Sequence, residues 1–357
     1  MRKGDAGMKR NRLMLLLAAL MAAMLVMSAC GKKTSPGEAL RNAWAASMEM
    51  KSFTFDGTFA IDGLEMPPGA LNETAQPYLS MLQNASVAVS GAYDRDSKHA
   101  EIILKPVIGG DLAVSIEVPI IWADGKTYVR IPTIPLLPLG DAAGRFVVIE
   151  PAGEGAALPA IDVDLYRKFF GEIMGIVFRH LDGDAYFREA KKGDIPGLPD
   201  DLKADRFVVF SITQDNADAF MTALAERILP EIIDLLIGSE AYRSMLQLTE
   251  EELKRAKEEL AATDSESLRG KLDELRQNLK VHEISMTGAI KGGNLVYQKL
   301  KVSVEQAENG GEPGKIGFSF DIRYDNINQD VTFEHDIPAE TLTMEEFWQS
   351  LFAGMAF

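Results

Sequence analysis

Cys30 is the residue whose type and surroundings point most clearly to a chemical reaction, because it is the only cysteine among 357 residues. It follows a basic start, the uninterrupted apolar run 13–27, and the small residues Ser28 and Ala29. This order is typical of a secretory signal peptide, and the run is short for a transmembrane helix, which needs about 20 apolar residues. We therefore predict that residues 1–29 are an export leader. The Cys30 thiol is expected to lie outside the folded domain, where it is available for modification.

The segment Ser28-Ala29-Cys30, preceded by Met27, resembles the lipobox of bacterial lipoproteins, which more often has leucine at the first of these positions. The resemblance implies a thioether from Cys30 to diacylglycerol and cleavage just before this residue. The alternative is an ordinary signal peptidase cutting near Ala29, which leaves a free thiol, although Met27 is large for the A-x-A pattern of that enzyme. Two acyl chains anchor a protein stably, at about 0.8 kcal/mol per buried CH₂. We expect a lipid-anchored protein on the extracytoplasmic face of the cell membrane.

The other residues that could take part in catalysis or metal binding form no recognised motif. The histidines are His99, His180, His282 and His335, and none has the spacing of a zinc-binding helix. Asp182-Gly183-Asp184 begins like a calcium loop, but Tyr186 and Phe187 occupy the positions of the next ligand and the glycine. The sequence contains no P-loop, G-x-S-x-G or dinucleotide fingerprint. We predict no enzymatic activity, no metal site and no cofactor apart from the diacylglycerol on Cys30.

Charge narrows the range of partners. The leader carries five of the 37 basic and one of the 53 acidic residues, which leaves a net charge near −20 on the remainder. Such a surface repels phosphate backbones, so nucleic acid is excluded as a partner. It also lacks the basic character of a membrane-binding face, so the lipid is expected to provide the attachment to the membrane. Without a second cysteine the exported domain has no internal disulfide and depends on its apolar core.

Apolar and polar residues alternate through most of the exported part. In "SFTFDGTFAI", from Ser52, the side chains of Phe53, Phe55 and Phe59 fall on one side of a strand. Similar runs, paired by charged or glycine-containing turns, predict about ten antiparallel strands. Helical spacing appears over 163–181 and in an insertion at about 215–280, where Pro230 should kink a helix. We predict a tether over 30–35 and one α+β domain over 36–357.

The chain resembles the LolA/LppX-like lipoproteins. The resemblance lies in the lipobox, the opening helix and the segments "KSFTFDGTFAI", "WADGKTYVRIP" and "FEHDIPAETLTMEEF". It implies a curved antiparallel half-barrel with helices over its concave face and an apolar cavity between them. The predicted cavity lining consists of Phe53, Phe55, Phe59, Val87, Val89, Val114, Ile116, Val118, Phe318 and Phe320.

Two functions follow from the resemblance, and the sequence leaves both open. One is binding of a hydrophobic ligand, such as an acyl lipid, in the apolar cavity. The alternative is an adaptor or sensor that regulates a cell-envelope enzyme by protein–protein contact, with the phenylalanines forming an ordinary packed core.

Overall fold

The computed structural model describes residues 34–66, 79, 82–83, 85–107, 116–134, 139–150, 162–181, 183–262, 270, 278–307 and 313–355. The chain divides into two compact units, Met1–Ser35 and Pro36–Phe357, and the description concerns the second. Cys30 and the predicted leader lie outside the described residues, as does Val114.

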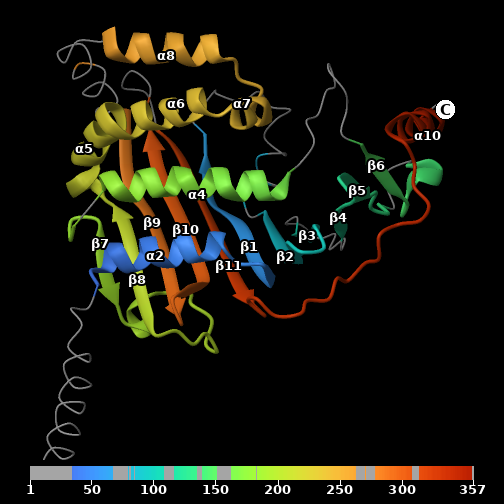
Figure 1. Ribbon diagram of the computed structural model, residues 1–357, viewed down its shortest axis with the longest axis horizontal. Helices are drawn as coiled ribbons and strands as arrows, with labels where there is room; N and C mark the ends of the chain where they lie inside the picture. The colour runs from blue at the N-terminus through green and yellow to red at the C-terminus, as the bar shows by residue number, and fades with distance from the viewer. Residues whose placement is uncertain are drawn as a thin grey trace, which may run out of the picture. The chain divides into compact units, whose positions relative to one another are not determined.

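One antiparallel sheet organises the second unit (Figure 1). Its strands are β1 (Ser52–Glu65), β2 (Ser86–Asp94), β3 (His99–Val107), β4 (Val118–Ala123), β5 (Lys126–Arg130), β6 (Phe146–Ile149), β7 (Phe187–Ala190), β8 (Arg206–Ile212), β9 (Leu279–Lys291), β10 (Asn294–Gln306) and β11 (Gly314–Asp325). The strand order is β6-β5-β4-β3-β2-β1-β11-β10-β9-β8-β7, so β6 and β7 are the outermost strands and the sheet is not closed. The predicted open α+β half-barrel is confirmed, with eleven described strands where about ten were expected.

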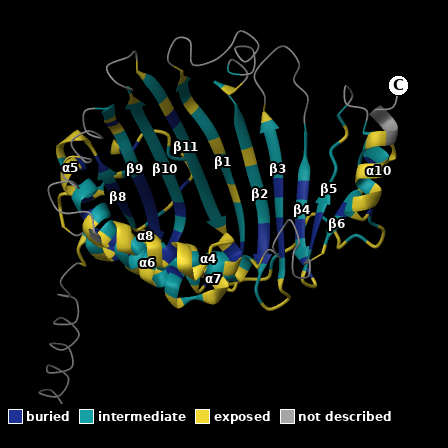
Figure 2. Ribbon diagram, turned by 90° about the horizontal axis from the view of Figure 1, so that it is seen from above, coloured by how far each residue is buried: buried dark blue, intermediate teal, exposed yellow. Residues whose placement is uncertain are grey.

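Glycines permit the close strand contacts of this sheet. A Cβ on Gly57 would lie 2.1 Å from the backbone oxygen of Asp321, and one on Gly91 would lie 1.9 Å from that of Glu101. Only a residue without a Cβ fits at either position, and glycines at such points allow a sheet to bend. The register of β1 against β11 also shifts after Ile61. Figure 2 shows the result, an open curved surface with helices on one side.

The helices of the described chain pack mainly on one face of the sheet (Figure 1). Those on this face or stacked over it are α2 (Pro36–Met48), α4 (Val163–His180), α5 (Gln214–Ala223), η3 (Leu224–Ile228, a π-helical turn), α6 (Leu229–Gly238), α7 (Glu240–Leu246) and α8 (Glu250–Ala262). Helix α2 is closest to the strands: its fully buried Leu40 occupies the space that a side chain on Gly288 would need. The π-helical turn ends two residues before Pro230, where the sequence predicts a kink.

The C-terminal segment fixes one edge of the sheet. Glu101, 1% exposed, accepts hydrogen bonds from the backbone nitrogens of Glu334 (2.6 Å) and His335 (3.0 Å) and lies 2.7 Å from His335 Nδ1. Further along, Leu342 pairs with Val147 of β6 as a parallel bridge, and α10 (Met344–Met355) then packs beside β6. Two short 3₁₀ turns, η1 (Gly140–Ala142) and η2 (Lys192–Asp194), complete the described elements.

Candidate apolar binding site

Strand register brings the predicted lining residues onto one face of the sheet. Phe59 of β1 stands opposite Phe320 of β11 and Val87 of β2. Because side chains alternate along a strand, residues two apart from these positions lie on the same face. The predicted residues that share this face are Phe53, Phe55, Phe59, Val87, Val89, Val118, Phe318 and Phe320. Ile116 is half-buried and lies before β4, outside any strand, and Val114 is outside the described residues.

The helices cover this face unevenly. Phe53 is 8% exposed and packs in a buried cluster with Met50, Tyr93 and Ala100, beneath the guanidinium of Arg167 at 5.4 Å from its ring centre. Phe53 is therefore a core residue. Phe59, six residues further along the same strand face, is 36% exposed.

An open region continues from Phe59 across the neighbouring strands, and we call it the apolar strip. The strip consists of Phe59, Ile61, Val87, Val302, Val304, Ile316, Phe318 and Phe320. Ile316 is 49% exposed, and no member of the strip belongs to a buried cluster of the described chain. The Phe59 and Phe318 rings lie 6.0 Å apart, within the range of a direct aromatic contact.

A cleft of about 190 Å³ continues the strip on β9. Its walls include Val281 and Ile284, which stand opposite Val304 and Val302 of the strip. Helix α5 provides the other wall, through Ala217, Phe220 and Met221 at helical spacing. From β9 to β2 the strip and cleft cross four strand intervals, roughly 19 Å at the usual separation of about 4.8 Å. The arrangement offers an elongated apolar surface.

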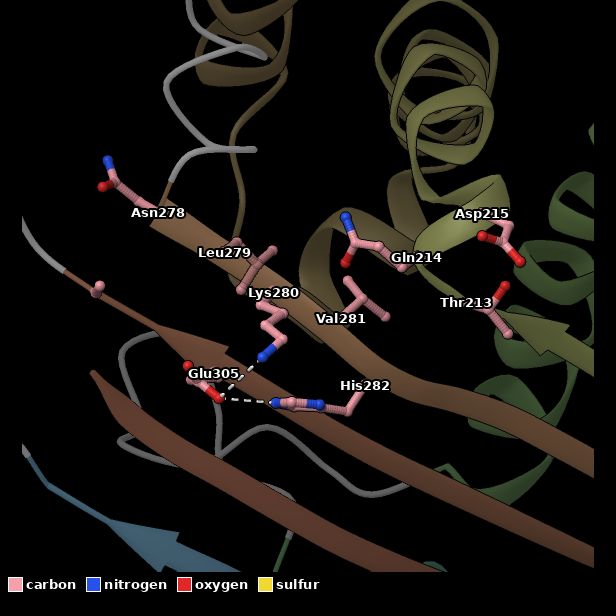
Figure 3. A pocket seen from close by; sticks show the side chains of 10 residues that line it. Thr213, Gln214, Asp215, Asn278, Leu279, Lys280, Val281, His282 and Glu305 are labelled. Carbon is pink, nitrogen blue, oxygen red and sulfur yellow. Dashed lines mark hydrogen bonds and ion pairs between the residues drawn. The ribbon is translucent and has the colours of Figure 1, made fainter. Parts of the chain in front are cut away.

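A polar cavity of about 630 Å³ adjoins the cleft and shares Gln214, Leu279 and Val281 with it (Figure 3). The side chains of Lys280 and His282 point toward Glu305, whose Oε2 lies 2.8 Å from His282 Nε2 and 3.9 Å from Lys280 Nζ. The hydrogen bond from His282 and the charge of Lys280 lower the pKa of Glu305. The cleft therefore has one polar end and one apolar end.

The chemistry available here is burial of apolar surface next to polar groups. Within the described ranges, no cluster of three or more His, Cys, Asp or Glu side chains is placed to hold a metal ion. The same part of the chain contains no helix with the length and apolar character needed to span a membrane.

The prediction missed half of the strip and the whole cleft. Val302, Val304 and Ile316 alternate with polar neighbours in "KVSVEQ" and "KIGF", a signal as clear as that of β1. The cleft carries no such signal, because it depends on how α5 packs against β9.

Comparisons with known proteins identify no family. No family model and no curated protein matches the chain. Lipovitellin, from a structure that describes lipid–protein interactions, is 8% identical, with 81% of this chain and 26% of lipovitellin covered at a TM-score of 0.25. The chain thus spans about a quarter of lipovitellin.

Two bacterial structures give similar values. A DUF1329 protein from Desulfovibrio piger is 11% identical, with 84% of this chain and 96% of that one covered and a TM-score of 0.20. A beta-barrel-like DUF1849 protein from Brucella abortus is 9% identical, with 77% and 98% covered and a TM-score of 0.19. TM-scores of this size assign no shared family or activity to the chain.

Proposed function

We propose that this protein is a lipid-anchored extracytoplasmic lipoprotein of the LolA/LppX-like kind that binds an apolar molecule along the apolar strip. The observation that supports binding most strongly is the continuous run of apolar side chains from the cleft across β10, β11, β1 and β2. Within this run, Phe59 is 36% exposed and Ile316 is 49% exposed. Contiguous exposed apolar surface on a folded protein marks binding sites. Each CH₂ group that a ligand buries there contributes about 0.8 kcal/mol.

The short tether supports exchange of this ligand with a membrane. Only residues 31–35 separate Cys30 from Pro36, where α2 begins. Five residues span at most roughly 17 Å when fully extended, at up to about 3.4 Å each. A lipid on Cys30 would therefore hold the domain beside the bilayer. Changing Cys30→Ser tests the anchor: the variant is expected to accumulate as the unlipidated precursor with its leader uncleaved, and normal processing with unchanged membrane fractionation would rule the anchor out.

Native mass spectrometry of protein purified from its own membrane tests ligand binding. The wild type should carry a non-covalent apolar mass, and Phe318→Asp should lose it because a carboxylate would be buried under the ligand. Phe352→Asp, on α10 and away from the strip, is the matched control and should retain the mass. If wild-type protein from gently solubilised membranes carried no ligand, the proposed ligand binding would be wrong.

Helix α10 favours the second candidate function, an adaptor for an envelope enzyme. The Trp348 and Phe352 rings stack with their centres 6.1 Å apart, and the two residues are 47% and 63% exposed. Exposed aromatic residues of this kind are common in protein–protein contacts. For this function, crosslinking in the cell should yield one stoichiometric partner that a Trp348→Ala/Phe352→Ala double variant loses. The protein would then contain no extractable lipid.

A further inference from the structure

Strand β8 ends before its neighbour β9, so one end of β9 has no described strand along one of its edges. The last pair between them is Ile212 opposite Ile284, whereas β9 continues to Leu279. Among the described strands, β10 is the only partner of residues 279–283. Every second residue of a strand directs its N–H and C=O groups to the same edge, so some of these groups face the position of a longer β8. We call residues 279–283 the open edge.

The chain leaves the sheet after β8 because Thr213 begins helix α5. The Thr213 backbone nitrogen donates to Oδ1 of Asn216 at 2.8 Å, and the Asn216 amide nitrogen donates to the backbone oxygen of Ser211 at 3.1 Å. These bonds belong to a capping box, which holds the turn from strand to helix. The Thr213 nitrogen is therefore already bonded and does not extend the strand pairing to Glu283.

The polar cavity of about 630 Å³ lies beside the open edge. Thr213, Gln214 and Asp215 of its lining come from the start of α5, and residues 279–282 come from the open edge (Figure 3). A strand occupies about 4.8 Å within a sheet, about 10 Å between layers and about 3.4 Å along the chain, or roughly 160 Å³ per residue. The cavity therefore has room for roughly four residues of an extended chain.

The side chains beside the open edge are apolar on one face and polar on the other. Leu279 and Val281 also line the apolar cleft, together with Phe220 of α5. Lys280 and His282 point instead toward Glu305 (Figure 3). Because side chains alternate along a strand, a chain added at the open edge would fit best with apolar residues at every second position.

The charge of the cavity favours a basic partner. The lining contains two carboxylates, Asp215 and Glu305, and one lysine, Lys280, which lies 3.9 Å from Glu305. The exported part of the chain also has a net charge near −20, which attracts cationic segments and repels acidic ones.

The open edge is too small for a contact between two folded domains. Five residues of strand edge measure roughly 17 Å by about 10 Å, which is roughly 170 Å². A stable interface between folded proteins buries about 800 Å² on each partner. A single extended peptide needs only the length of one strand, so it suits this edge better than a second copy of the chain.

We propose that the open edge binds an extended basic peptide of a partner protein, which adds a strand beside β9 and places alternate apolar side chains at the cleft. In strand addition the backbone hydrogen bonds provide affinity, and the pockets for alternate side chains provide specificity. This interaction goes beyond ligand binding on the apolar strip, because it depends on backbone groups of β9.

Fluorescence anisotropy with a labelled peptide, Lys-Val-Thr-Val-Thr-Val-Thr-Lys, tests strand addition. Two methylated forms are the matched probes: one carries N-methyl groups on the three valines and the other on the three threonines. Every second N–H of an added strand points to β9, so one form loses its hydrogen bonds to β9 and the other keeps them. A third probe has glutamate in place of both lysines.

We expect the parent peptide to bind, and one methylated form to bind roughly 30-fold more weakly than the other, for the loss of about two hydrogen bonds of about 1 kcal/mol each. The glutamate peptide should bind more weakly than the parent. Equal weakening by both methylated forms, tighter binding of the glutamate peptide, or no binding of the parent would overturn the proposal.

Amide hydrogen exchange locates the peptide on the unaltered protein. The parent peptide should slow exchange within residues 279–283 and leave β7 unchanged. Phe318→Asp, which removes the ligand from the apolar strip, should show the same protection, so that peptide binding and ligand binding are tested independently. Protection that is absent from the open edge, or that appears on α10 instead, would overturn the proposal.

Discussion

The Phe59→Ala variant separates a binding surface from a packed core. The Phe59 side chain is 36% exposed, and a phenylalanine presents about 200 Å² of surface, so a ligand on the apolar strip buries roughly 70 Å² of this residue. At about 25 cal/mol per Å² the lost contact amounts to about 1.8 kcal/mol, or roughly a 20-fold increase in Kd. Phe53, on the same strand face, would behave differently: its truncation should cost about 3–5 kcal/mol of stability because it is buried.

Binding is measured by fluorescence titration with the uncharged dye N-phenyl-naphthylamine, which brightens in apolar surroundings. An uncharged dye is chosen because the acidic chain would repel an anionic one. Phe352→Ala serves as the control, since Phe352 is an exposed phenylalanine on α10, away from the strip. The control should bind the dye like wild type, and a urea unfolding curve should show that Phe59→Ala remains folded.

Two results would refute this reasoning. Equal weakening by Phe59→Ala and Phe352→Ala would mean that the dye adheres to any exposed aromatic ring. An unchanged Kd for Phe59→Ala in a folded protein would mean that the strip is not the binding surface.

Three further substitutions test the packing around the sheet. Glu101→Ala leaves the imidazole and backbone nitrogen of His335 without their buried acceptor, so urea denaturation should show a loss of about 3–5 kcal/mol. Burial lowers the pKa of His99 in the folded protein, whereas the unfolded imidazole binds a proton below about pH 6.5. Wild-type stability should therefore fall as the pH drops below about 6.5. Denaturation curves of His99→Phe should lack this pH-dependent loss of stability. In Gly91→Ala the new Cβ collides with a backbone oxygen and with the Phe55 ring, so the melting temperature should drop, for an overpacking cost of about 1–3 kcal/mol.

Local alternation made much of the fold predictable. The period of two around Phe53, Phe55 and Phe59 is a property of neighbouring residues, so it placed all three on one strand face without knowledge of the partner strands. No such local pattern determines which strand pairs with which. The pairing of Phe59 with Phe320 joins segments more than 250 residues apart, and nothing in either segment specifies the other.

Burial was the part of the site that the sequence did not specify. Phe53 and Phe59 are the same residue type on the same face, yet one is core and the other is open. The difference arises because Val163 and Arg167 of α4, together with Met50 just after α2, pack over the Phe53 end of the strand, whereas the described helices form no buried cluster over Phe59. A cavity of about 470 Å³ has the same origin, since it lies where α4 begins beside two hairpin turns.

Photo-crosslinking with an apolar diazirine probe, followed by peptide mapping, tests most directly whether the open part of the curved sheet holds an apolar molecule. We expect saturable labelling of peptides from β1, β10 and β11 that contain Phe59, Val302 and Phe318, with competition by unlabelled probe. Labelling confined to α10, or spread without saturation over the surface, would contradict the account.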